Sequence, residues 1–161
     1  MAENKGYLDT CLVSAFVRND IGADEMSALE QLLAWHESGR LVLACSPVVE
    51  AELAKIPPEY SGPHFNRLAK FRSLPKADVG GITRLGPLGL PMGNPSYGLW
   101  RSLREVLPDE QDAWHVFVAS CNRFQYLVTV DSRTMLSRKK AVLDTSGVHL
   151  VLPTEFRRIA E

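Results

Sequence analysis

Residues 112–131 read DAWHVFVASCNRFQYLVTVD and join a helical pattern to a strand pattern. From about Glu110 to Arg123, apolar and small residues recur at helical spacing, which predicts a helix with one buried face. The run YLVTVD at 126–131 is short and apolar, has the length of a strand and ends in an acid. We therefore predict a helix followed by a strand whose carboxyl end carries Asp131.

The same alternation of helix and strand extends over the rest of the chain. The run LVLAC at 41–45 is apolar throughout, which suits a parallel strand covered by helices on both faces. Gly39, before it, stands where a glycine should end the preceding helix. The alternation predicts an α/β fold, a three-layer sandwich around a central parallel sheet, in a single domain over 1–161. The predicted strands are 6–9, 41–45, 126–131 and 148–152, and the predicted helices are 12–19, 24–38, 46–56, 64–74, 99–107, 110–123, 133–143 and a terminal helix from 153.

Residues 75–99 interrupt this alternation. They contain six glycines and four prolines, residue types that break regular structure. We predict a Gly/Pro-rich loop insertion here, and a loop of this length in a small domain is usually either functional or disordered. Tyr97 and Trp100 stand close to it and either anchor the loop to the core or meet a partner.

The composition narrows the class of protein. The chain has 161 residues, 45% of them hydrophobic, which is typical of one globular domain. Lys and Arg number 18 against 19 Asp and Glu, so the net charge of −1 excludes a generally basic nucleic-acid coat but not a local basic patch. No apolar run approaches the roughly 18 residues of a membrane helix, and the first ten residues lack the apolar core of a secretion signal. We expect a cytoplasmic protein without membrane association, whose three cysteines are buried reduced thiols (Cys11, Cys45 and Cys121).

Four acids lie at the ends of predicted strands or in the helices next to those strands. Asp9 ends the first strand and Asp131 the third, Glu52 lies in the helix after the second strand, and Asp112 lies in the helix that feeds the third. Ligands of open parallel sheets bind at the carboxyl ends of the strands, so we expect the four carboxylates to converge there. Such a cluster is unstable when ionised and unpaired, and Mg²⁺ or Mn²⁺, which prefers oxygen ligands, would resolve the conflict.

Each of these acids also has a purely structural explanation. Asp9 could cap the following helix, and Asp131 could form a turn at the end of its strand. Asp112 could simply favour a helix N-terminus, and Glu52 could be a solvated helix residue. Taken singly these positions are weak signals, whereas their shared order and placement at element ends point to one site.

The chain resembles a PIN domain, and most closely the VapC-type toxin ribonucleases. The family's four acids fall on Asp9, Glu52, Asp112 and Asp131. The segment 54–108 is longer than expected for such a toxin, and its Gly/Pro-rich part has no counterpart in the family pattern. The resemblance is carried by YLDTCLVSAF at 7–16, SPVVEAEL at 46–53, residues 112–131 and GVHLVLPTEF at 147–156.

The resemblance implies a metal-dependent endoribonuclease that hydrolyses RNA phosphodiesters with one or two Mg²⁺ or Mn²⁺ ions held by the four acids. It implies that Thr10 and Thr129 orient the carboxylates. His115 lies one turn after Asp112 and either hydrogen-bonds a carboxylate or packs in the core. A toxin of this type implies an antitoxin partner and a homodimer.

An acidic site repels a polyanion, so basic residues must offset it. The best candidates for binding nucleic acid are Arg67, Lys70, Arg72 and Lys76 on and after one predicted helix, whose Phe65 and Phe71 we expect to face inward. Each basic cluster could equally be a solvated helix face. Further candidates are Arg101, Arg104, Arg138, Lys139 and Lys140.

Other classes fit less well. An aspartyl-phosphate phosphatase needs a D-x-D pattern after the first strand, but position 11 is Cys11, and a receiver domain needs paired early acids that are also missing. The serious alternative is a catalytically silent PIN-like module that binds RNA or a protein partner.

Overall fold

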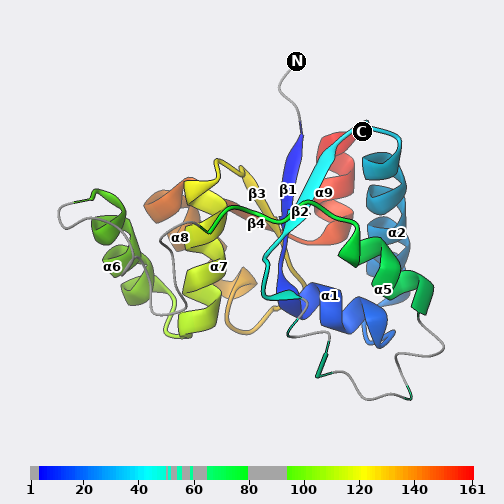
Figure 1. Cartoon of the computed structure of the whole chain (residues 1–161). Coiled ribbons are helices and arrows are strands. Elements are labelled where there is room, and N and C mark those ends of the chain that lie inside the picture. Colours follow the sequence, from blue (N-terminus) through cyan, green and yellow to red (C-terminus); the bar gives the residue numbers. More distant parts are fainter. Residues whose placement is uncertain (1–3, 50, 52–53, 56–58, 60–64, 80–93) are drawn as a thin grey trace.

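The computed structural model describes residues 4–49, 51, 54–55, 59, 65–79 and 94–161 (Figure 1). Within these residues one sheet has four strands, all parallel, in the order β2-β1-β3-β4. This confirms the predicted mixed α/β class with a parallel sheet. Three strands are shorter than predicted and the first, predicted over 6–9, is shifted by one residue, so Asp9, Thr129 and Asp131 lie just beyond strand ends. The strands are β1 (Lys5–Leu8), β2 (Val42–Cys45), β3 (Tyr126–Val128) and β4 (His149–Val151).

Helices cover both faces of this sheet (Figure 1). One face carries α1 (Thr10–Val17), α2 (Ala23–Glu37), α5 (Phe65–Arg72) and α9 (Pro153–Ala160). The other carries α6 (Ser96–Val106), α7 (Glu110–Cys121) and α8 (Lys139–Ser146), the last preceded by a short 3₁₀ turn, η1 (Leu136–Arg138). The arrangement is compatible with the predicted three-layer sandwich.

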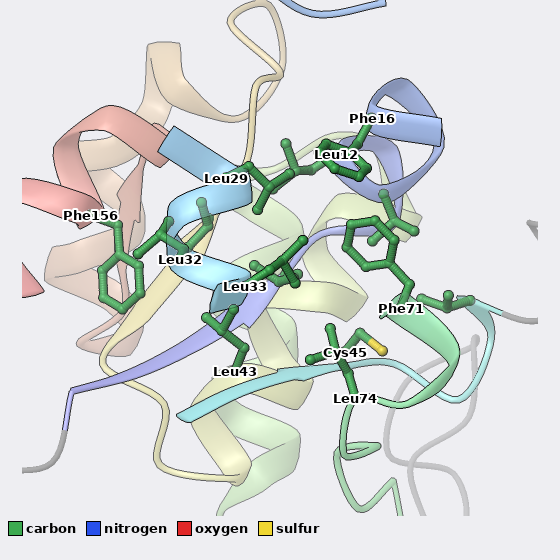
Figure 2. Close-up of a cluster of buried hydrophobic side chains, with 14 of the residues drawn as sticks. Leu12, Phe16, Leu29, Leu32, Leu33, Leu43, Cys45, Phe71, Leu74 and Phe156 are labelled. Carbon is green, nitrogen blue, oxygen red and sulfur yellow. The ribbon is translucent and has the colours of Figure 1, made fainter. Parts of the chain in front are cut away.

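The strands divide their side chains between two buried clusters because successive residues point to opposite faces. Tyr7 joins the cluster under α6, α7 and α8, while Leu8 joins the one under α1, α2, α5 and α9. Leu127 and Val128 divide in the same way. Figure 2 shows the second cluster, in which leucines of α2 meet side chains from α1, β2, α5 and α9. Burial of each such side chain contributes about 1.5–3 kcal/mol, so the two clusters fix the sheet between its helix layers.

Helix ends follow the signals in the sequence at several points. Gly39 has φ of 76° directly after the C-cap of α2, which confirms the predicted glycine stop. Asp109 caps α7, since its side chain accepts hydrogen bonds from the backbone N–H groups of Gln111 and Asp112. Of the helix predicted over 46–56, Val49 and Ala51 are helical and residues 54–55 form a turn, while 50, 52–53 and 56 lie outside the described residues. At its predicted start the Ser46 hydroxyl oxygen accepts the N–H of Val48 at 3.1 Å.

Two predicted boundaries were wrong. The loop predicted to reach residue 99 ends earlier, because the Asn94 side chain accepts the N–H of Ser96 at 2.9 Å and α6 begins there. At its start, residues 75–77 run beside β2: Ala77 donates to the Cys45 carbonyl at 2.8 Å. The helix predicted over 133–143 begins only with η1, since Asp131 holds Arg133 and Thr134 in a turn. Residues 80–93 lie outside the described residues.

The cysteine prediction was partly wrong. All three thiols are free, but Cys45 is buried whereas Cys11 and Cys121 are exposed. The two exposed cysteines lie on α1 and at the end of α7, where the helix surface turns away from the two buried clusters. In the part of the chain that the structure describes, no helix is both long and apolar enough to cross a membrane.

A substitution at Gly6 tests how tightly α9 is packed on the sheet. A Cβ atom at Gly6 would lie 2.7 Å from Phe156 Cε1 and 3.2 Å from Leu43 Cδ2, inside a filled core. Gly6→Ala should therefore lower the free energy of unfolding by about 1–3 kcal/mol, measured by urea denaturation.

Gly98→Ala is the matched control, because a Cβ there meets nothing within 4 Å and the residue lies inside α6. It should raise stability by about 0.5–1 kcal/mol through helix propensity. Equal effects of the two substitutions would contradict the packing of α9 on β1 and β2.

Candidate active site

The candidate site lies at the carboxyl edge of the sheet, beside β1 and β3. The chain leaves β1 for β2 on one side and later returns to β3 on the other, so β1 borders the topological switch point where ligands of such sheets bind. Asp9 directly follows β1, and its N–H donates to the Val128 carbonyl at the end of β3 at 3.1 Å. Asp131 follows β3 by three residues. The two strand ends thus bring two of the predicted acids to one place.

Thr129 connects these two acids. Its hydroxyl donates to Asp9 Oδ2 at 2.9 Å, and the same oxygen accepts the N–H of Asp131 at 3.1 Å. Both Asp9 and Thr129 are buried. The hydroxyl therefore orients one oxygen of the Asp9 carboxylate, in the way that the resemblance implied for Thr129.

Asp112 reaches the same edge from the first turn of α7. Thr134 Oγ1 lies 2.5 Å from Asp112 Oδ2 and 2.8 Å from Asp131 Oδ2. A hydroxyl has one hydrogen and can donate to only one of two carboxylates. When Asp112 is protonated it donates to Thr134, which in turn donates to Asp131, and every contact is satisfied.

The pKa values agree with this assignment of the proton. Burial raises the pKa of Asp112 to about 6, partly offset by the Thr134 hydrogen bond and reinforced by the charges of Asp109, Asp9 and Asp131. Burial likewise raises the pKa of Asp9 to about 6, reinforced by the charge of Asp131 and opposed by the Thr129 hydrogen bond and by the backbone N–H groups of Cys11 and Thr10. Burial also acts on Asp131, but hydrogen bonds from Thr134 and Arg133 outweigh it and lower its pKa. At neutral pH the site holds more negative charge than its surroundings stabilise.

Cys11 reports the same negative field. Although Cys11 is exposed at the helix surface, the protein around its thiol partly excludes water, and this desolvation and then the charges of Asp9, Asp112, Asp131 and Asp109 raise the thiol pKa to about 12. Carboxylates from the residue after β1, from α7 and from the segment after β3 therefore lie close enough to act on one neighbouring thiol.

His115 lies inside the site rather than at its margin. It is buried, with Nδ1 2.8 Å from the Tyr7 hydroxyl and Nε2 3.1 Å from Thr10 Oγ1. Its Nε2 is 3.8 Å from Asp9 Oδ1, a near contact without a hydrogen bond. Of the two predicted roles, the structure favours a packed histidine that holds Thr10 and Tyr7 next to Asp9.

Tyr7 and Thr134 are site residues that the sequence did not point out. Tyr7 stands in an apolar strand, and its hydroxyl finds His115 only through the packing of α7 on β1. Thr134 fell inside a predicted helix. The spacing of Asp131 and Thr134, an Asp followed three residues later by a hydroxyl residue, is typical of an Asx turn and was the available signal.

The residues present fit a hard divalent cation by their donor chemistry. Asp9 Oδ1 is buried and accepts no hydrogen bond of good geometry, and the nearby N–H groups of Thr10 and Cys11 only partly offset the effect of burial on the Asp9 pKa. Mg²⁺ usually binds one or two carboxylates and keeps several waters, a demand that Asp9 with Asp112 or Asp131 meets. Among the described residues no group of three His, Cys, Asp or Glu side chains is arranged as a ready-made metal site. Glu52, the fourth predicted acid, lies outside the described residues.

The predicted basic surface is used in part for structure. Lys76 Nζ donates to the carbonyls of Phe71, Arg72 and Leu74, the end of α5, while Lys70 and Arg72 are exposed. The Arg67 guanidinium lies 5.4 Å from the Phe16 ring centroid. Phe71 is buried against Phe16, which confirms its inward direction, and the side chain of Phe65 lies outside the described part.

The remaining basic and aromatic candidates contact the helix layer of α6, α7 and α8 or lie at its edge. Arg104 and Arg138 donate to backbone carbonyls, and Lys140 pairs with Asp144. Lys139 lies near Glu155, and Arg101 is exposed on α6. Trp100 packs edge-on against Phe117, which favours an anchor between α6 and α7 over a partner contact, and Tyr97 is half-buried beside it on α6.

Comparisons of the chain with protein-family models, with curated proteins and with solved structures found no match.

Asp112→Asn tests the electrostatic strain of the site. A folded pKa of about 6 against 3.8 unfolded means that the folded protein binds this proton more tightly, so stability falls as pH rises from about 4 to 6 and stays lower above. Asn cannot ionise and resembles the protonated acid. The variant should therefore be more stable than the parent by about 1–3 kcal/mol at pH 7.5, with the gain disappearing near pH 4.

Urea unfolding at the two pH values without divalent metal measures this difference. Asp144→Asn, at an exposed position in α8, is the control and should change little at either pH. A loss of stability in Asp112→Asn at pH 7.5 would show that Asp112 is a satisfied structural residue.

Proposed function

We propose that the protein is a divalent-metal-dependent endoribonuclease of the PIN type, the toxin of a type II toxin–antitoxin pair. The observation that carries the proposal is the unpartnered, buried oxygen of Asp9 at the switch point of a parallel sheet, beside Asp112 and Asp131. Stability alone does not account for three acids gathered where burial raises the pKa of two of them to about 6. A site that binds a cation and a phosphodiester accounts for it.

Each residue of the site has a role in this proposal. Asp9, Asp112 and Asp131 hold the ion, and Glu52 completes or polarises the site. A bound Mg²⁺ or Mn²⁺ ion supplies Lewis acidity and lowers the pKa of a coordinated water. Thr129 fixes the direction of the Asp9 carboxylate through its 2.9 Å hydrogen bond.

Thr134 and His115 support this set. The Thr134 hydroxyl fixes the separation of Asp112 and Asp131. His115 has partners on both ring nitrogens, Tyr7 and Thr10, so it serves to position Thr10 and need not transfer a proton.

The alternative function is a catalytically silent PIN-like module that binds RNA or a protein partner. One observation favours it: the acids that the structure describes are not arranged as a three-ligand metal site. The proposed nuclease gathers Asp9, Asp112 and Asp131 around the ion when it binds, whereas the silent module never does.

The toxin assignment extends the proposal to partners and place of action. RNA is the substrate, an antitoxin covers the acidic groove, and the protein acts in the cytoplasm as a homodimer. Expression of the chain alone should then arrest growth of a bacterial host. Arrest that persists in a variant without nuclease activity would contradict the toxin role.

Removal of single carboxylates tests the chemistry. Asp9→Asn and Asp131→Asn should each lower the rate of cleavage of a single-stranded RNA by more than about 100-fold, the upper end of the effect of outer hydrogen-bond partners of a metal ligand. EDTA should abolish cleavage by the parent protein, and Mg²⁺ or Mn²⁺ should restore it. Asp144→Asn is the matched control at an exposed acid and should keep the parent rate. Full activity in EDTA would refute the proposal.

Thr129→Val tests the orientation of Asp9. Valine keeps the shape of the side chain but cannot donate to Asp9 Oδ2 or accept from Asp131. Activity should fall about 10–100-fold, in the range measured for residues that hold a metal ligand in place. Circular dichroism checks that the variant folds, and an unchanged rate in a folded variant would remove Thr129 from the site.

A further inference from the structure

A small cavity opens beside the acidic site and follows the surface of α1. It has a volume of about 160 Å³ and is lined by Thr10, Cys11, Ser14 and Arg18 of α1 and its C-cap, and by Gln111 of α7. Thr10 and Cys11 follow Asp9 in the chain, and Gln111 precedes Asp112. The cavity therefore begins where the acids converge.

The lining residues from α1 share one helical face. Thr10, Ser14 and Arg18 are spaced by four residues, so they lie in a row along the helix. At 1.5 Å per residue the row extends about 12 Å from the acids. It carries a hydroxyl at Ser14 and ends in the exposed cation of Arg18, the one cation among the residues that line this cavity.

Further cations lie on the neighbouring helix. α5 packs beside α1 (Figure 1). The contact uses the face of α1 opposite to the row, because the Arg67 guanidinium lies 5.4 Å from the ring centroid of Phe16, which is two residues from Ser14 along the helix. Lys70 and Arg72 of α5 are exposed. Arg18 is therefore the cation that borders the cavity, whereas the cations of α5 lie outside it.

We propose that this cavity binds the backbone of a single-stranded RNA next to the bond that is cut, with Arg18 contacting a phosphate. The inference rests on the proposed nuclease function, because it assumes that the scissile phosphate lies at the acids. A polyanion held at a negative site needs a cation close by, and Arg presents a planar set of donors that suits phosphate. A narrow cavity admits one strand, the form of RNA that proteins read most directly.

Salt dependence of RNA binding and cleavage tests the proposal. Each phosphate contact contributes about 0.7 to the slope of log affinity against log salt for a single strand. Arg18→Gln should reduce this slope by about 0.7 and raise KM about 3–5-fold at low salt, with kcat nearly unchanged. Fluorescence anisotropy with a labelled RNA 12-mer gives the slope, and steady-state cleavage of the same RNA gives KM and kcat.

Arg158→Gln is the matched control, since it removes the same charge from an exposed position on α9. Arg18→Lys should restore most of the slope, because a cation remains. If the parent cuts RNA and Arg18→Gln behaves like Arg158→Gln, the path along α1 is wrong and the nuclease stands. If the parent binds RNA without cutting it and Arg18→Gln lowers the slope, the path stands and the nuclease fails. A parent that neither binds nor cuts RNA overturns both.

Discussion

The buried carboxylate of Asp9 is the constraint on which the rest of the site depends. Only 1% of the residue is exposed, one oxygen accepts a hydrogen bond from Thr129, and the other has no hydrogen-bond partner. Burial of a charged carboxylate costs free energy unless a positively charged group pairs with it. The pKa of about 6 expresses this cost, because the group keeps its proton more readily than an exposed acid does. The position is fixed by the fold, since β1 ends at Leu8 between two neighbouring strands and leaves Asp9 at their common edge.

Asp112 and Asp131 add to this strain. Thr134 joins them through a single hydroxyl, an arrangement that is satisfied with a proton on Asp112 and unsatisfied without one. The pKa of Asp112 is also about 6, so at physiological pH the acid is mostly ionised in surroundings that disfavour its charge. A divalent cation at these carboxylates would compensate that charge, and relief of the repulsion would contribute to binding the ion.

The sequence was sufficient to predict those elements and acids whose positions follow from neighbouring residues in the chain. Asp9 and Asp131 follow apolar runs of strand length, and parallel strands bring their carboxyl ends together. Asp112 lies in the first turn of a helix with many buried apolar residues, which precedes one of those strands. The sequence did not indicate the residues whose role depends on packing between distant segments. Tyr7 meets His115 across 108 positions, and Thr134 meets Asp112 across 22, so neither pair has a local signature. Lys76 resembled a nucleic-acid contact in the sequence, but its ammonium caps the end of α5.

Metal binding is the central claim, and a titration of thermal stability with Mg²⁺ or Mn²⁺ at pH 7.5 tests it most directly. At 100 times the dissociation constant a ligand bound only by the folded protein adds about 2.7 kcal/mol, so the melting temperature should rise by several degrees. The rise should shrink at pH 5, where protons occupy Asp9 and Asp112, and should be absent in Asp9→Asn. A melting temperature that is independent of either metal at pH 7.5, or an equal rise in Asp9→Asn, would contradict the account.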